Sequence, residues 1–440
     1  MHARNLAALV TTTLLASTAL ADPPPKRAMP VYDGRAEAPV TAADIARGVG
    51  RVVLYPIYLV VNYGVRWPVG KLVQFFESSK GVRKVVQTLF LGPPTPTLAI
   101  FPIAFYDFGF KSSIGVRMLW NNGFATPGSA YSLKLGFGGK DFWRGDGQFR
   151  FALPAQLFVQ LDLQAKHRPD QVFYGVGSRT PEAAKSRFQQ GRFAVEGSFG
   201  FKQLMAFVGT SLQTTGPSTF GTDPSIDQAV DEGLITELPA GYKELLVTNR
   251  AGARIHLDSR HHRLPYNSGA RFDATVERAS AEHHGAWWHV DATLGGALRL
   301  DRVGEYSLDL RVRLELIEAP QDVDVPFLEL ASVGGSRDLR GFVGGRGRDK
   351  SAVAVTLDYQ WPLAAWLDAT MYVGAGNVFG EQFSGLYAGK LRGSFGLGIA
   401  LAGISDERQI ELWSAVGTDP FDEGFTINSF RLVLAYAHDY

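Results

Sequence analysis

The 440-residue sequence contains no cysteine, so whatever core it buries forms without disulfides. Charge of one sign is not in excess either: 44 basic and 43 acidic side chains leave a net charge of +1. This balance gives no overall basic surface of the kind that binds nucleic acid. Long apolar runs are missing as well. The closest, Val52–Val61, has a proline inside it and is far shorter than the ~20 residues of a spanning helix.

The first 21 residues read as a secretory signal peptide. Arg4 supplies the positive charge, Leu6–Ala16 the apolar segment, and Ala19-Leu20-Ala21 the small residues of a cleavage site. The mature chain is therefore expected to begin at Asp22 in an exported, thiol-oxidising compartment, where the lack of cysteine avoids mispairing.

Residues 22–97 differ from the rest of the chain. After a Pro-rich lead, Thr41 and Asp44 fit a capping box, and apolar residues at helical spacing follow. Two more short amphipathic patterns cover Val69–Phe76 and Val82–Phe90, before the stiff linker Gly92–Thr97. The segment is predicted to form short helices, either against a membrane face or a barrel mouth or as a small cap, on the periplasmic side or at the interface.

From about Phe105 the apolar period changes from helical spacing to alternation. In Ser307–Leu316 the even positions are Leu or Val, whereas four of the odd positions are charged. Leu157–Gln164 and Arg271–Glu277 repeat the pattern, and turn residues bound each segment. Such strands suit one face in lipid and one in water, although a soluble sandwich also alternates.

Segment length and ring placement favour the membrane. The strands are expected to run about ten to twelve residues, with aromatic side chains near their ends. We predict an all-β transmembrane antiparallel barrel over 98–440, of about sixteen strands, with a short helical N-terminal extension and a long loop at Thr214–Gly241. The last segment resembles an outer-membrane β-signal. Its ring-bearing and apolar residues lie on one face of the expected strand: Phe430, Leu432, Leu434, Tyr436 and Tyr440.

Several motifs, in order, resemble those of the outer-membrane assembly and translocation barrels, the BamA/TamA-type superfamily. The main one is Leu339-Arg340-Gly341-Phe342, preceded by Gly334-Gly335, which resembles the signature of that family's sixth loop. Supporting segments are FYGVGS with Tyr174 and Gly175, DSRHHRLPYNSG with Asp258 and Arg260, LDYQWP with Asp358, and YVGAGNVF with Gly376.

The resemblance implies that loop six folds into the lumen, where Arg340 pairs with Asp358; Leu339, Gly341 and Phe342 complete this latch. A guanidinium confined in a lumen needs a carboxylate, which its planar fork can hold at two points. The sequence departs from the family at Gly374, where an acid is usual, so the latch is expected to rest on one carboxylate. Residues 22–97 are also expected to contain none of the family's N-terminal polypeptide-transport-associated (POTRA) repeats.

The implied function is insertion or translocation of proteins, or of lipid, at the bacterial outer membrane through a lateral seam. Expected partners are outer-membrane lipids, client proteins and a separate periplasmic chain. One alternative is a channel or scaffold without insertase activity, and a weaker one is a lumenal lipid-active enzyme. We expect that the protein is not an enzyme and binds no cofactor, since the sequence shows neither a serine-esterase nor a zinc-protease motif. No metal site is expected at the histidine pairs His261-His262 and His283-His284 or at His256 and His289, because adjacent histidines on a strand face opposite ways.

Overall fold

The computed structural model describes residues 98–436, except 219, 261–267, 301–305, 337, 365–366 and 402–409. The expected signal peptide, the expected helices of 22–97, His261, His262 and Tyr440 lie outside the described residues. Within them, no helix is long and apolar enough to cross a membrane.

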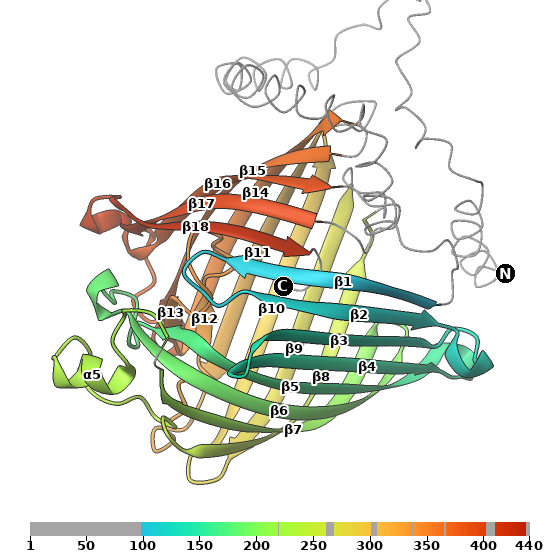
Figure 1. Cartoon of the computed structure of the whole chain (residues 1–440), viewed down its shortest axis with the longest axis horizontal. Coiled ribbons are helices and arrows are strands. Elements are labelled where there is room, and N and C mark those ends of the chain that lie inside the picture. The colour runs from blue at the N-terminus through green and yellow to red at the C-terminus, as the bar shows by residue number, and fades with distance from the viewer. Residues whose placement is uncertain are drawn as a thin grey trace, which may run out of the picture.

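Sixteen antiparallel strands close into one barrel, in the order β1-β18-β17-β16-β15-β14-β11 and then β10 down to β2 (Figure 1). This confirms the predicted antiparallel β-barrel of about sixteen strands, but not the short helical extension predicted before it. The wall strands are β1 (Leu98–Asp107), β2 (Ser113–Asn121), β3 (Ala130–Gly139), β4 (Phe142–Ala152), β5 (Leu157–Phe173), β6 (Ser186–Phe201), β7 (Leu204–Pro217), β8 (Leu245–Asp258), β9 (Gly269–Ala281), β10 (Gly285–Arg299), β11 (Ser307–Glu318), β14 (Ser351–Ala364), β15 (Leu367–Phe379), β16 (Arg392–Leu401), β17 (Ile410–Pro420) and β18 (Ile427–Tyr436).

The connections differ between the two ends of the barrel. One end, here the turn end, carries connections of two to ten residues together with Leu98 and Tyr436. The other, the loop end, carries the longer loops, among them 174–185 (loop three), 218–244 (loop four) and 319–350 (loop six). Helical and inner elements are α5 (Ile226–Asp231) of loop four, the hairpin β12 (Ala331–Val333) and β13 (Gly347–Asp349) of loop six, and the short turns η3 (Gly123–Ala125), η4 (Pro154–Gln156), η5 (Glu182–Ala184), η6 (Glu381–Phe383), η7 (Ala388–Lys390) and η8 (Phe421–Glu423).

Two expectations from the sequence are corrected. Strands run from 9 residues in β2 to 17 in β5, a wider range than ten to twelve. The long loop does not begin at Thr214, because Thr214–Pro217 pair with β6, and it continues beyond Gly241 to the start of β8 at Leu245.

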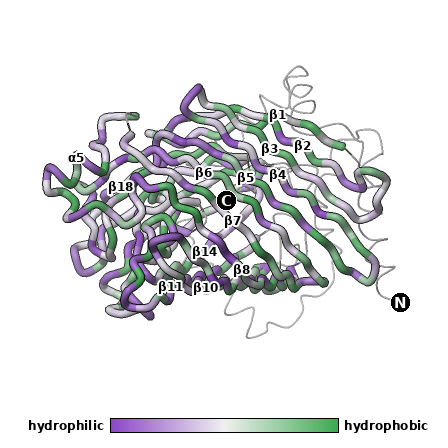
Figure 2. Tube along the Cα trace, turned by 90° about the horizontal axis from the view of Figure 1, so that it is seen from below, coloured by the Kyte–Doolittle hydropathy of each residue, from purple (hydrophilic) through white to green (hydrophobic). Residues whose placement is uncertain are grey.

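Alternation along each strand separates an apolar outer face from a polar lumen. Leu310 and Leu314 of β11 are exposed, whereas Arg313 and Glu315 are buried inside. In Figure 2 hydrophobic and hydrophilic positions alternate along the strands in the same way. Because the ring is closed, each wall strand has a neighbour on both sides. Its backbone N–H and C=O groups can then hydrogen-bond within the barrel, as a lipid environment requires.

Loop three crosses the loop end of the barrel. It leaves β5 and returns in β6, yet its Thr180 carbonyl oxygen accepts hydrogen bonds from Arg346 (2.9 Å) and from Arg392 of β16 (3.0 Å). Asn377 of β15 likewise donates to the Ser178 carbonyl oxygen (2.8 Å). Because β15 stands eight strands from β5 in a ring of sixteen, loop three spans the mouth. Loops three, four and six share a buried apolar cluster with the ends of β5 and β6: Phe173, Ala184, Phe188, Ile226, Ala229, Ile235, Tyr242 and Phe327.

Candidate functional site: loop six and the β1–β18 seam

Loop six is the sixth connection at the loop end, and it folds back into the lumen. Its turn starts at Gly334, whose φ of +112° is a conformation that side chains other than glycine's rarely adopt, and where an added Cβ would lie 2.2 Å from the Val343 carbonyl oxygen. The Gly335 amide then donates to the Phe342 carbonyl oxygen (2.8 Å). This bond closes a compact lobe that presents Leu339–Phe342, the loop-six tip, to the inner wall.

Arg340 at the tip meets the inner face of β14 and two aromatic rings. Its guanidinium forms a two-point ion pair with Asp358, in which Nη2 lies 3.0 Å from Oδ2. The guanidinium carbon also lies 4.5 Å from the ring centre of Tyr372 and 4.0 Å from that of Trp413. Asp358 is 3% exposed, so this charge depends on Arg340 for compensation. The structure therefore brings together the two residues that the resemblance paired.

Tyr372 occupies the place where a second acid would point. Its hydroxyl accepts a hydrogen bond from the Arg340 amide (3.0 Å) and donates one to the Asp338 carbonyl oxygen (3.0 Å). A Cβ at Gly374 would come within 2.7 Å of that hydroxyl and 3.2 Å of the Leu339 side chain. Gly374 thus leaves room for Tyr372 and Leu339, and the Tyr372 ring faces the Arg340 guanidinium.

The rest of the tip packs on β16, β17 and β18. The Gly341 amide donates to Ser394 Oγ (2.8 Å), and Ser429 Oγ donates to the Gly341 carbonyl oxygen (2.8 Å). The buried ring of Phe342 covers Gly417, where an added Cβ would lie 2.4 Å from it. Small residues on the wall therefore form the seat of the tip.

Gly341→Ala is expected to dislodge the tip, because its Cβ would fall 2.0 Å from the Val416 carbonyl oxygen, which belongs to the fixed ladder of β17. Overpacking of this kind costs about 1–3 kcal/mol. The measurement is the temperature at which the barrel loses its folded mobility on a semi-native gel. Gly344→Ala is the matched control, since a Cβ there meets nothing within 4 Å. Equal lowering by both variants would contradict the close seat.

The seam between the first and last wall strands is short and is bridged by an arginine. In the described part of the chain, β1 and β18 pair at Tyr106–Leu434 and Asp107–Val433, while every other neighbouring pair of wall strands shares eight or more positions. Arg431 of β18 holds Asp107 of β1 with Nη2 2.7 Å from Oδ2.

The same arginine reaches loop six: Arg431 Nη1 donates to the Phe342 carbonyl oxygen (3.2 Å). Asp107 and Arg431 are both buried, at 4% and 8% exposure. One guanidinium thus joins β1, β18 and the loop-six tip.

The other residues predicted from the resemblance are dispersed. Tyr174 and Gly175 begin loop three, and Arg346 of loop six stacks 4.2 Å above the Tyr174 ring. Asp258 and Arg260 pair with each other (2.8 Å), and Arg260 also lies 3.5 Å from Asp309 of β11, which stands opposite Asp358 in the strand register. Gly376 permits close packing on β14, since a Cβ there would lie 2.5 Å from the Val353 carbonyl oxygen.

In the last strand, Phe430, Leu432 and Leu434 share the outward face, opposite Arg431 and Val433. Tyr436 ends β18, and Tyr440 lies outside the described residues.

Burial affects two charged groups where loop three meets loop six, Glu182 and Arg346. It raises the pKa of the Glu182 carboxyl, an effect that Arg346 and Lys185 oppose. It also lowers the pKa of the Arg346 guanidinium. Arg346 Nε and Glu182 Oε2 lie 3.4 Å apart, and this ion pair offsets part of the cost of burying the Arg346 guanidinium.

The described histidines have protein partners. His283 and His284 lie in the turn between β9 and β10 rather than on a strand, which corrects the argument from opposite strand faces. His284 contacts Glu244 (2.9 Å), and His289 lies between Glu277 and Glu315, 3.0 Å from each. His289, Asp291 and Glu315 could converge on a metal ion, but Arg313 already binds both of these carboxylates.

Comparison with known proteins bears on the fold. No family model and no curated protein matches the sequence. Among solved structures, BamA from Haemophilus ducreyi lacking POTRA domains 1–3 superposes with a TM-score of 0.53 at 14% identity, over 77% of this chain and 70% of that one. The barrel shares the fold of BamA.

Two further structures cover a similar part of the chain. CdiB from Acinetobacter baumannii gives a TM-score of 0.47 at 13% identity, and CdiB from Escherichia coli 0.45 at 11%. Each covers 78% of this chain, which spans 60% and 64% of their respective lengths.

Several residues of the site carry no motif in the sequence. Trp413, Ser394, Ser429 and Arg431 all contact the loop-six tip or Arg340. The only signal available for them is their position on the inner face of alternating strands.

Proposed function

We propose that this chain is an outer-membrane barrel that assists the insertion or translocation of proteins, by opening laterally between β1 and β18. The loop end, which carries the longer loops, would face the outside of the cell and the turn end the periplasm. Client proteins and surrounding lipid would be its partners, and a separate periplasmic chain would deliver clients in place of POTRA repeats.

The observation that carries the proposal is the Arg431 junction. In the described chain the seam consists of two paired positions, a backbone hydrogen bond from Phe108 to Leu432, and the ion pair from Arg431 to Asp107. Since Arg431 also binds the tip at Phe342, movement of loop six and opening of the seam would be coupled. An opened β1 edge would present unpaired N–H and C=O groups, which a client strand can satisfy by pairing.

A second candidate is a channel or scaffold without insertase activity. It is favoured by a lumenal cavity of about 640 Å³ lined by β2 to β8, on the side of the barrel away from the loop-six tip. Loop three crosses the mouth above the lumen, so such a channel would conduct only past or after displacement of that loop.

One preparation tests both. The purified full chain is placed in liposomes, and the folding rate of an unfolded client barrel is compared with that in empty liposomes, while conductance is recorded in planar bilayers. We expect insertion above the empty-liposome rate. Conductance with no acceleration for any client would favour the channel and refute the insertase proposal.

A further inference from the structure

Three basic side chains stand directly opposite one another on the inner face of the barrel, and two of them, Arg144 and Arg192, line the lumenal cavity. In the strand register, Lys166 of β5 faces Arg144 of β4 on one side and Arg192 of β6 on the other. Side chains paired in this way have Cβ atoms about 5 Å apart, and like charges there are destabilising. All three side chains lie on the inner face of the wall, so neither lipid nor bulk water lies between their charges. A row of this kind calls for a counter-charge.

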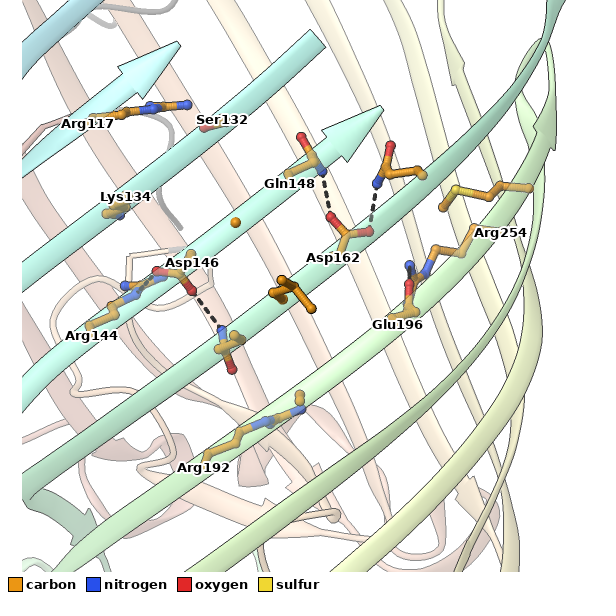
Figure 3. A pocket seen from close by; sticks show the side chains of 16 residues that line it. Arg117, Ser132, Lys134, Arg144, Asp146, Gln148, Asp162, Arg192, Glu196 and Arg254 are labelled. Carbon is orange, nitrogen blue, oxygen red and sulfur yellow. Dashed lines mark hydrogen bonds and ion pairs between the residues drawn. The ribbon is translucent and has the colours of Figure 1, made fainter. Parts of the chain in front are cut away.

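The wall carboxylates near this row are already engaged. Figure 3 shows Arg144, Arg192 and the cavity acids. Asp146 accepts from Arg144 Nε and from Gln164 (3.0 Å), while Glu196 is paired with Arg254 (2.9 Å).

Asp162, the remaining acid of the cavity wall, accepts from two glutamines, Gln148 (3.0 Å) and Gln160 (2.8 Å). Among the residues that line the cavity, five are cationic and three are anionic. The cavity wall therefore carries an excess of positive charge, and Lys166 stands between two of its cations.

Two donors of the row have no partner among the described residues. Lys166 makes no hydrogen bond or ion pair there, and the buried Nε of Arg192 has no acceptor. Nη1 of Arg117, farther along the same cavity, is also buried without an acceptor. Glu329 of loop six comes near, but it is held by Gln213 (2.7 Å) and Arg250 (3.2 Å).

We propose that Lys166 and Arg192, with Arg144 beside them, form a binding site for a phosphate group in the lumen. A dianionic oxyanion has the charge to offset the row and enough acceptor atoms for an ammonium and two guanidinium groups. The group arrives either as free phosphate on a soluble molecule or as a lipid headgroup. This site goes beyond the proposed insertion function and does not depend on it.

The first test is calorimetric titration of the full chain in a non-ionic detergent, with inorganic phosphate in one arm and short-chain phosphatidic acid, a phosphate monoester, below its micelle concentration in the other. We expect saturable binding that Lys166→Gln or Arg192→Gln weakens about ten-fold. Lys202→Gln, an equal charge change at an exposed turn, should leave it unaltered. Binding in the first arm identifies a soluble ligand, and binding in the second alone identifies a headgroup.

Thermal unfolding gives an independent readout, because the unfolding transition of each variant also shows whether that variant is folded. In phosphate-free buffer Lys166→Gln should unfold at a higher temperature than the wild-type chain, because it removes the repulsion. Added phosphate should raise the wild-type midpoint, and Lys166→Gln should need about ten-fold more phosphate for the same rise. Absence of saturable binding in both arms, or equal loss in Lys202→Gln, would overturn the site.

Discussion

Arg340→Ala is expected to lower markedly the temperature at which the protein loses its folded gel mobility, while the barrel itself still forms. The substitution leaves Asp358, 3% exposed, without its guanidinium and also removes the cation–π contacts with Tyr372 and Trp413. Breaking a buried pair from one side costs about 3–5 kcal/mol. Limited proteolysis should at the same time cut within loop six, which the wild-type chain protects.

Companion variants separate charge from shape. Asp358→Ala should be as harmful as Arg340→Ala, and Arg340→Lys should fall between, since an ammonium keeps the charge but loses the two-point contact. The double variant Arg340→Met/Asp358→Leu should be milder than either alanine variant, because it leaves no buried charge unpaired. If the parent and both alanine variants resist heat equally, the pair does not hold loop six.

The wall of the barrel was predictable from the sequence because it depends on a local pattern. In Ser307–Leu316 the alternation alone separates Leu310 and Leu314 outside from Arg313 and Glu315 inside. Strand ends were less predictable. Thr214–Pro217 read as loop from their composition, yet pairing with β6 keeps them in β7.

The pairing of Arg340 with Asp358 came from family resemblance, and residue types around it could not have supplied it. Gly374 was noted only as a missing acid. In the structure its lack of a side chain makes room for Tyr372, whose hydroxyl bonds to two backbone groups of loop six. The contact of Tyr372 in place of an acid at Gly374 depends on side-chain directions across three strands. The alternation of apolar and polar residues does not encode those directions.

The ion pair across the seam is the contact that is least predictable from the sequence. Asp107 and Arg431 are 324 positions apart, and each resembles any other charged residue on a lumenal face. Only closure of the barrel brings β1 to β18 and sets the register that pairs them. The same holds for loop three, whose contacts with β15 and β16 follow from spanning the mouth.

A disulfide across the seam is expected to abolish client insertion while preserving the barrel. Asp107→Cys/Val433→Cys suits the purpose, since the chain has no other cysteine and these residues face each other in register. The hydrogen bond from the Phe108 amide to the Leu432 carbonyl oxygen (3.1 Å) makes their position a non-hydrogen-bonded pair. Cα atoms there lie about 4.5 Å apart, within the range of a disulfide.

Oxidation should bring the insertion rate down to that of empty liposomes, and reductant should restore it, because a covalent seam cannot part to offer the β1 edge. Conductance should not change on oxidation, since the lumen is untouched. The single variants Asp107→Cys and Val433→Cys under the same oxidant control for loss of the Arg431 ion pair and for thiol damage. Insertion at an undiminished rate by the cross-linked barrel would mean that clients do not pass between β1 and β18, and that the Arg431 junction serves only to close the wall.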